Sequence, residues 1–107
     1  MLIPGIKEFR AQDYTEALPL LLESAHDGYA EAQCAVGNIY QLGLGDIDID
    51  EMKAIHWYYQ AANQGYSSAT SNLAGMIWPI SSDAAAALNQ LAQQQKAEAM
   101  EETVLAG

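Results

Sequence analysis

An internal repeat of 37 residues constrains the fold more than any other feature of this sequence. Without a gap, residues 13–40 align with residues 50–77, and six positions are identical in the two copies. The identical pairs are Asp13/Asp50, Ala17/Ala54, Ala25/Ala62, Gly28/Gly65, Tyr29/Tyr66 and Ala32/Ala69. Several other aligned positions keep their apolar character. A period of this length is typical of solenoids in which each repeat is a pair of α-helices.

Residues that commonly begin and end helices recur at matching places in the two copies. Asp13 and Asp50 stand where a carboxylate can accept from the free N–H groups of a first helical turn, and Glu16 completes a capping box with Asp13. Gly28 and Gly65 stand where a left-handed residue can end a helix. Apolar residues fall at helical spacing between these positions. The sequence therefore predicts four helices, at about 14–27, 30–42, 51–64 and 67–78.

The segments on both sides of the repeats are also predicted to be helical. Residues 4–12 are expected to form a short helix whose Ile6 and Phe9 cover the exposed end of the stack. At the other side, Pro79 ends the fourth long helix because the residue before a proline disfavours helical geometry. A further helix is then expected over about 82–95, where apolar residues again recur at helical spacing.

Together these helices predict one all-α domain. Its repeat core covers about residues 13–78 and holds about two and a half antiparallel helix pairs, with the last helix as a cap. The tail at about 96–107 is polar and acidic, and we expect it to fray. Because 107 residues are enough to bury a sizeable core, a single domain over residues 1–107 is expected.

Charge and composition argue against several classes of partner. Fourteen acidic residues against four basic ones, Lys7, Arg10, Lys53 and Lys96, give a formal net charge of −10, which disfavours nucleic acids and anionic membrane surfaces. No stretch approaches the ~20 apolar residues of a membrane span. The single cysteine, Cys34, leaves no internal disulfide and favours a reducing compartment. We therefore expect a cytoplasmic protein.

Residues 30–65 carry a motif of alanine, glycine and aromatic residues at fixed spacing. Its positions are Ala30, Ala32, Val36, Gly37, Tyr40, Gly43, Gly45, Asp50, Lys53, Ala54, Trp57, Tyr58, Ala61, Ala62 and Gly65. This motif resembles the Sel-one-like repeat, a branch of the tetratricopeptide-like (TPR-like) helical repeats. Degenerate half-repeats extend the resemblance to about residues 13–78. It implies a short right-handed α-α superhelix that serves as a non-catalytic adaptor or scaffold for other proteins.

An apparent calcium motif in the middle of the chain fails on spacing. Asp46, Asp48 and Asp50 stand at the first, third and fifth places of an EF-hand loop. The sixth place needs glycine and is Glu51, while the twelfth needs a bidentate glutamate and is Trp57. A solvated loop whose last aspartate caps a helix is the better interpretation.

Other residues that often carry chemistry also lack the neighbours they would need. His26 and His56 have no cysteine or second histidine at i+3 or i+4, so they are interpreted as surface or helix-end residues. Cys34 is interpreted as a small apolar filler within a helix rather than as a nucleophile. Trp57 and Tyr58 are expected in the core rather than on a binding platform. We therefore expect no catalytic residue, metal or cofactor.

The predicted binding surface lies on the first helix of each pair, because these helices line the concave side of a solenoid. Non-core positions there offer amide and hydroxyl groups suited to a peptide backbone. The candidate partner-binding residues are Gln33, Asn38, Gln41, Thr70, Ser71, Asn72 and Trp78. Trp78 has two interpretations, since it could be buried beneath the helix that begins near Ser82 or exposed at the mouth of a groove.

Three functions from different classes remain open from the sequence. The first is an adaptor that binds a peptide or a folded protein, as the repeat suggests. The second is an acidic inhibitor or immunity-type protein that neutralises a basic toxin or enzyme, as the net charge of −10 suggests. The third is a self-associating protein that forms a homodimer through the exposed ends of its repeat stack.

Overall fold

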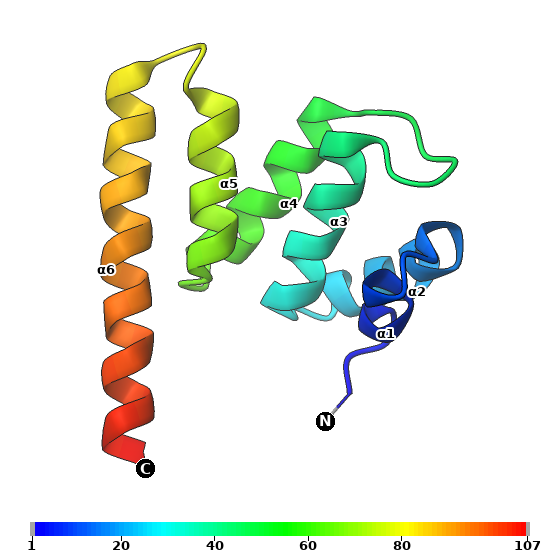
Figure 1. The fold of residues 1–107 in the computed structure, drawn as a ribbon, viewed down its shortest axis with the longest axis horizontal. Coiled ribbons are helices and arrows are strands. Elements are labelled where there is room, and N and C mark those ends of the chain that lie inside the picture. The colour runs from blue at the N-terminus through cyan, green and yellow to red at the C-terminus, as the bar shows by residue number, and fades with distance from the viewer. Residues whose placement is uncertain (1, 107) are drawn as a thin grey trace.

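The computed structural model describes residues 2–106, with side chains as far as Glu102, and within that range the chain folds into six α-helices without a β-strand (Figure 1). The helices are α1 (Ile6–Arg10), α2 (Tyr14–His26), α3 (Ala30–Leu42), α4 (Glu51–Asn63), α5 (Ser67–Ile77) and α6 (Ser82–Ala106). The predicted all-α class is confirmed, and the four long helices of the repeat region lie within one residue of their predicted bounds.

Each helix packs against its neighbours in the chain, which makes the molecule a short helical solenoid. Its dimensions of 40 × 35 × 21 Å are those of a thin stack rather than a sphere. In Figure 1 the stack runs from α1 and α2 through α3, α4 and α5 to α6, which stands at the far edge. Helices α3 and α4 therefore form the centre of the stack, with helices on both sides.

Three of the predicted helix ends form as expected and one does not. Gly28 and Gly65 adopt left-handed φ angles of 99° and 86° after α2 and α4. Asp50 caps α4, because its Oδ1 accepts from the backbone N–H of Lys53 at 3.1 Å. Asp13, however, makes no side-chain capping bond. The tight turn after α1 holds it at φ −86° and ψ 65°, outside the extended conformation that Asp50 adopts.

Alanines at the helix contacts allow neighbouring helices to approach closely. In the first copy of the repeat Ala17, Ala25 and Ala32 are almost fully buried, and in the second copy so are Ala54 and Ala69, the counterparts of Ala17 and Ala32. Around them lie two adjoining apolar clusters, one over α1 to α4 and the other over α3 to α5. Small side chains at these levels let neighbouring helices contact each other closely.

The contact between α3 and α4 depends on a glycine. Gly37 lies against the aromatic ring of Tyr58, and a Cβ atom placed at Gly37 would come within 2.5 Å of Tyr58 Cε1. Tyr58 is fully buried beneath α3 as a result. Its hydroxyl can therefore reach the far side of α3, where the candidate site lies.

Helix α6 is longer than predicted. It continues to Ala106 instead of ending near residue 95, because Ser82–Ala106 contains no glycine or proline and is rich in good helix formers. Among its residues up to Glu102, Ala85, Ala92 and Gln95 are buried and share the face that packs on α5. The side chains from Lys96 to Glu102 are all exposed, so the end of this helix extends into solvent.

Candidate partner-binding groove

Three adjoining hollows follow one side of the stack and are lined by α1, α3, α5, α6 and the residues that flank them. The hollow between α5 and α6 has a volume of about 620 Å³, and it shares Ser68 and Asn72 with a central hollow of about 250 Å³. The central hollow shares Ile6, Arg10 and Glu31 with a third, of about 400 Å³, beside α1. We call the three together the groove. Helices α2 and α4 contribute no lining residue to it.

A network of polar side chains forms the floor of the central hollow. The hydroxyl of Tyr58 lies 2.5 Å from Oδ1 of Asn38 and 2.6 Å from Oε1 of Gln41. A phenol has one hydrogen, so it donates to one of these amide oxygens at a time. Across the groove, Nδ2 of Asn72 donates to Oδ1 of Asn38 at 3.2 Å and contacts Sγ of Cys34 at 3.8 Å. The network therefore joins α3, α4 and α5.

Two titratable groups of this network stay neutral near pH 7. Burial raises the pKa of the Cys34 thiol to about 11, against a smaller lowering by its contact with Asn72. Burial likewise raises the pKa of Tyr58 above its ordinary value. A thiol with such a pKa carries almost no thiolate at neutral pH, so Cys34 is a poor nucleophile. Its burial agrees with the predicted role as a filler inside α3.

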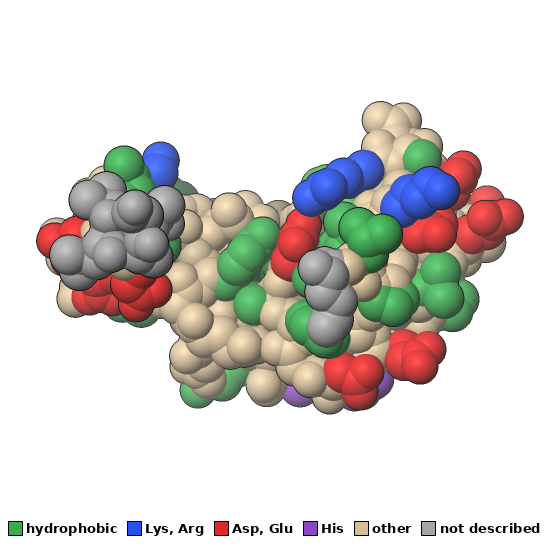
Figure 2. Space-filling model, turned by 90° about the horizontal axis from the view of Figure 1, so that it is seen from below, with side chains coloured by type: hydrophobic (Ala, Val, Ile, Leu, Met, Phe, Trp, Pro, Cys, Tyr) green, Lys and Arg blue, Asp and Glu red, His purple; other side chains and the backbone are tan. Residues whose placement is uncertain are grey.

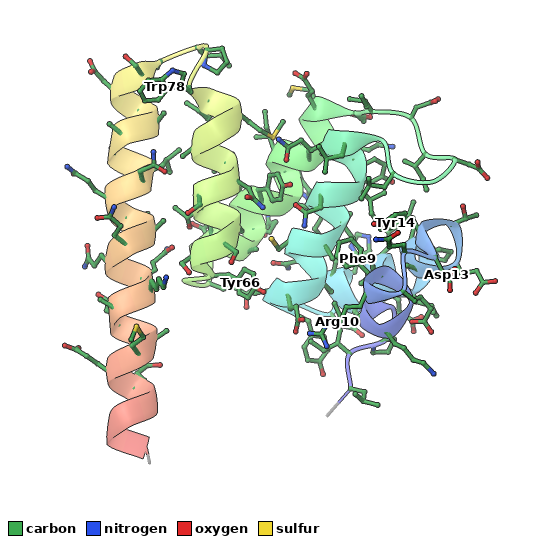
Figure 3. The ribbon with its side chains drawn as sticks, in the orientation of Figure 1. Phe9, Arg10, Asp13, Tyr14, Tyr66 and Trp78 are labelled. Carbon is green, nitrogen blue, oxygen red and sulfur yellow. The ribbon has the colours of Figure 1, made fainter. Side chains whose placement is uncertain are left out.

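An ion pair stands where the central hollow meets the hollow beside α1. Nη2 of Arg10 lies 2.9 Å from Oε1 of Glu31, which joins α1 to the first turn of α3. Both side chains are solvent-accessible, with exposed fractions of 74% and 36%, so this pair contributes little to stability. Tyr66, just before α5, lines the central hollow, and burial raises the pKa of its phenol. Figure 3 shows Arg10 and Tyr66 on either side of the first turn of α3.

Two of the predicted partner-binding residues lie inside the protein, which corrects their assignment to the groove. Gln33 is 5% exposed; its Nε2 donates to the carbonyl of Ala25, and its Oε1 accepts from Gln64. Thr70 is fully buried, and its hydroxyl donates to Oε1 of Gln95 at 2.7 Å. Because these groups satisfy buried polar atoms, they are not available to a partner.

Among the other candidates, the structure brings some together and separates the rest. Asn38 and Asn72 line the central hollow, and Ser71 lines the hollow between α5 and α6. Gln41 belongs to the network below the groove but is not among the residues that line it. Trp78 is 57% exposed, which excludes the interpretation that it is buried beneath α6. It lies at the end of α5 opposite to Tyr66, away from the groove (Figure 3).

Several lining residues come from helices outside the repeat and were missed by the sequence reasoning. Ile6, Phe9 and Arg10 enter the groove from α1, while Asn89 and Lys96 enter it from α6. A signal for the second pair existed, because positions 89, 92, 93 and 96 recur at helical spacing on one side of α6. No repeat pattern marked α1, whose Ile6 and Phe9 were expected only to cover the end of the stack.

The opposite side of the stack holds the two histidines. Their rings meet the ring of Trp57 edge to face, at centroid distances of 5.0 Å for His26 and 4.9 Å for His56. Trp57 itself is 7% exposed and Tyr58 is fully buried, which confirms their predicted core positions. No group of three or more His, Cys, Asp or Glu side chains is placed to hold a metal ion within the described residues.

Comparisons with known proteins place a repeat over the central helix pair. Residues 30–66 match the family model "Sel1 repeat". A stretch of 56 residues is 41% identical to chitin synthase regulatory factor 3 of Schizosaccharomyces pombe. The stretch covers 52% of this chain but only 6% of that protein. No solved structure matches. Separately, the helices formed by the described residues include none with the length and apolar character needed to cross a membrane.

Proposed function

We propose that this chain, in which residues 30–66 form a Sel1 repeat, is a non-catalytic adaptor that holds an extended segment of a partner protein in the groove. Sel1 repeats are generally protein-interaction modules. The observation that carries the proposal is the continuity of the three hollows, since Ser68, Asn72, Ile6, Arg10 and Glu31 are each shared between adjoining hollows. An extended peptide needs a continuous channel of this kind.

The chemistry of the central hollow supports a peptide as the ligand. Nδ2 of Asn72 already donates to Oδ1 of Asn38, which leaves Nδ2 of Asn38 as a donor and Oδ1 of Asn72 as an acceptor. One donor and one acceptor on facing helices complement the C=O and N–H groups of a peptide backbone. The network beneath them, anchored by the buried Tyr58, holds both amides in place.

Selection from a display library of random 12-residue peptides tests this function. An extended residue spans about 3.3 Å, so about 12 residues match the 40 Å long dimension of the molecule. Ser68→Trp places a bulky uncharged side chain at an exposed position where two hollows meet. Asn63→Trp adds the same side chain at an exposed position on the opposite side of the stack, beside His26 and His56.

The expected result is that selected peptides bind the wild type and the Asn63→Trp variant equally and bind Ser68→Trp about tenfold or more weakly, because the added ring excludes the ligand. Circular dichroism spectra confirm that both variants keep their helices. Equal affinity for both variants, or a failure of the library to yield any peptide that binds, contradicts the proposal.

Self-association is a second candidate function, and exposed apolar residues on α6 and in the segment before it favour this candidate. Trp78 and Ile80 are 57% and 77% exposed, and Leu91 and Met100 on α6 are also exposed. Exposed apolar residues along this edge of the stack can pair two copies through α6. Light scattering at rising protein concentration tests this candidate, because a constant monomer mass rules it out.

The acidic inhibitor is a third candidate and rests on the net charge of −10 alone. Its partner would be a basic protein held on acidic surface away from the groove, with an affinity that falls as salt screens the charges. We also propose that the whole chain forms one domain, since every helix contacts the next. A reducing compartment such as the cytoplasm suits the lone Cys34.

A further inference from the structure

The few basic residues of this acidic chain gather along the groove. The sequence contains four lysines and arginines, and three of them line the groove. Lys7 and Arg10 lie in the hollow beside α1, and Lys96 lies in the hollow between α5 and α6. Figure 2 shows the Lys and Arg side chains in view along one edge of the molecule, on both sides of a shallow depression. The fourth basic residue, Lys53, is paired with Asp50 on α4.

Acidic residues are almost absent from the lining of the groove. Of the 14 acidic residues in the sequence, only Glu31 lines the groove, and it is already paired with Arg10 at 2.9 Å. The groove therefore has a positive local charge on a molecule of net charge −10. Charges farther than about 8 Å are largely screened at physiological salt. A bound ligand is thus influenced chiefly by the cations that it contacts.

We propose that the groove is selective for acidic peptides, with carboxylates placed to meet Lys7 and Arg10 at one end and Lys96 at the other. The partner class is therefore an extended acidic segment of another protein, and the basic toxin or enzyme is the wrong class for this surface. This inference rests on the proposed function, because it names the ligand of the same groove.

The remaining lining fits such a ligand between its charged ends. Ile6 and Phe9 supply apolar surface beside the cations of α1, while Asn38 and Asn72 face the peptide backbone. A guanidinium has five N–H donors, and Glu31 uses few of them, so Arg10 can hold a ligand carboxylate as well. Glu31 competes with that carboxylate for Arg10. Its removal is therefore expected to strengthen the binding of an acidic ligand.

The composition of the selected 12-residue peptides gives the first test. We expect them to be enriched in Asp and Glu relative to the unselected library. One selected peptide is then synthesised in two forms, with its carboxylates intact and with each replaced by the corresponding amide. Because an exposed ion pair is worth about two- to fivefold in affinity, loss of two or three pairs is expected to weaken binding about tenfold, measured by fluorescence anisotropy.

Single charge changes then locate the effect. Arg10→Gln and Lys96→Gln are each expected to weaken binding of the acidic form about two- to fivefold. Lys53→Gln removes the same charge outside the groove and is expected to leave the affinity unchanged. Glu31→Gln is expected to raise it by a similar factor. The amide form of the peptide is expected to respond less than the acidic form to the changes at Arg10, Lys96 and Glu31.

The outcomes separate this inference from the function on which it rests. If selected peptides are neutral or basic, or if Lys53→Gln weakens binding as much as Lys96→Gln, the charge selectivity is wrong. Binding that is still blocked by Ser68→Trp would then leave the peptide-binding function standing. A library that yields no binding peptide overturns both.

Discussion

The contact between Gly37 and Tyr58 gives the sharpest prediction about stability. Replacement of Gly37 by alanine puts a methyl group 2.5 Å from Cε1 and 2.6 Å from Cδ1 of the Tyr58 ring. The ring cannot move aside easily, because Tyr58 is fully buried and its hydroxyl is held by Asn38 and Gln41. The substitution therefore overpacks the contact between α3 and α4.

Two opposing effects set the magnitude of the change. Overpacking a tight core contact costs about 1–3 kcal/mol, whereas exchange of a mid-helix glycine for alanine stabilises a helix by about 1 kcal/mol. Overpacking is expected to win for Gly37→Ala, since the added atom is closer than any real Cβ contact. The net loss is then up to about 2 kcal/mol, which corresponds to a fall in Tm of up to about 15 °C for a domain of this size.

Gly75→Ala is the matched control, because it makes the same exchange within α5. A Cβ atom at Gly75 meets nothing within 4 Å, so only the gain in helix propensity remains, about 1 kcal/mol. Urea denaturation followed by circular dichroism at equal protein concentration measures both variants. The two substitutions are expected to shift stability in opposite directions. A Gly37→Ala variant as stable as Gly75→Ala would refute the proposed contact.

Three further predictions follow from capping, a buried hydrogen bond and a buried thiol. Asp50→Ala is expected to cost about 1 kcal/mol of stability, because the side chain of Asp50 caps α4. Asp13→Ala removes no capping bond and is expected to cost little. Urea denaturation compares the two variants. Gln95→Ala removes the hydrogen bond from the Thr70 hydroxyl and the one to the carbonyl of Ala62, and leaves Thr70 only the longer contact with the carbonyl of Tyr66 at 3.4 Å. It is expected to cost about 1–3 kcal/mol in the same assay. The pKa of the Cys34 thiol is about 11 in the folded protein, above the ordinary value of 9.0. Its contribution to the free energy of unfolding is therefore constant below pH 9 and is lost between pH 9 and pH 11. Over that range the stability of Cys34→Ala is expected to fall less than that of the wild type.

The positions of the long helices could be predicted because the sequence repeats their boundaries. Gly28 and Gly65 occur at the same register in both copies and both adopt the left-handed conformation that ends a helix. Asp50 caps α4 as predicted, but the equivalent Asp13 does not cap α2, because the turn after α1 differs from the long loop before α4. A repeat thus predicts shared structure only where the flanking connections are also alike.

The candidate site could be predicted less completely, because the sequence does not show which polar side chains are buried. Gln33 and Thr70 occupy equivalent positions in the two copies, and both are buried. Gln33 reaches the carbonyl of Ala25 directly, whereas the shorter Thr70 leaves room for Gln95 of α6 to reach the equivalent carbonyl of Ala62. In the second copy, a glutamine from a distant helix thus takes the role that Gln33 has in the first. This exchange depends on the tertiary fold and cannot be predicted from the spacing of residues in the sequence.

Chemical-shift mapping with a selected 12-residue peptide tests the central claim most directly, because it locates a ligand on the folded protein without any substitution. We predict shifts in the side-chain amides of Asn38 and Asn72 and in backbone signals around Arg10, Ser68 and Lys96, which together trace the groove. Shifts confined to α2 and α4, with these signals unchanged, would contradict the claim that the groove holds the partner.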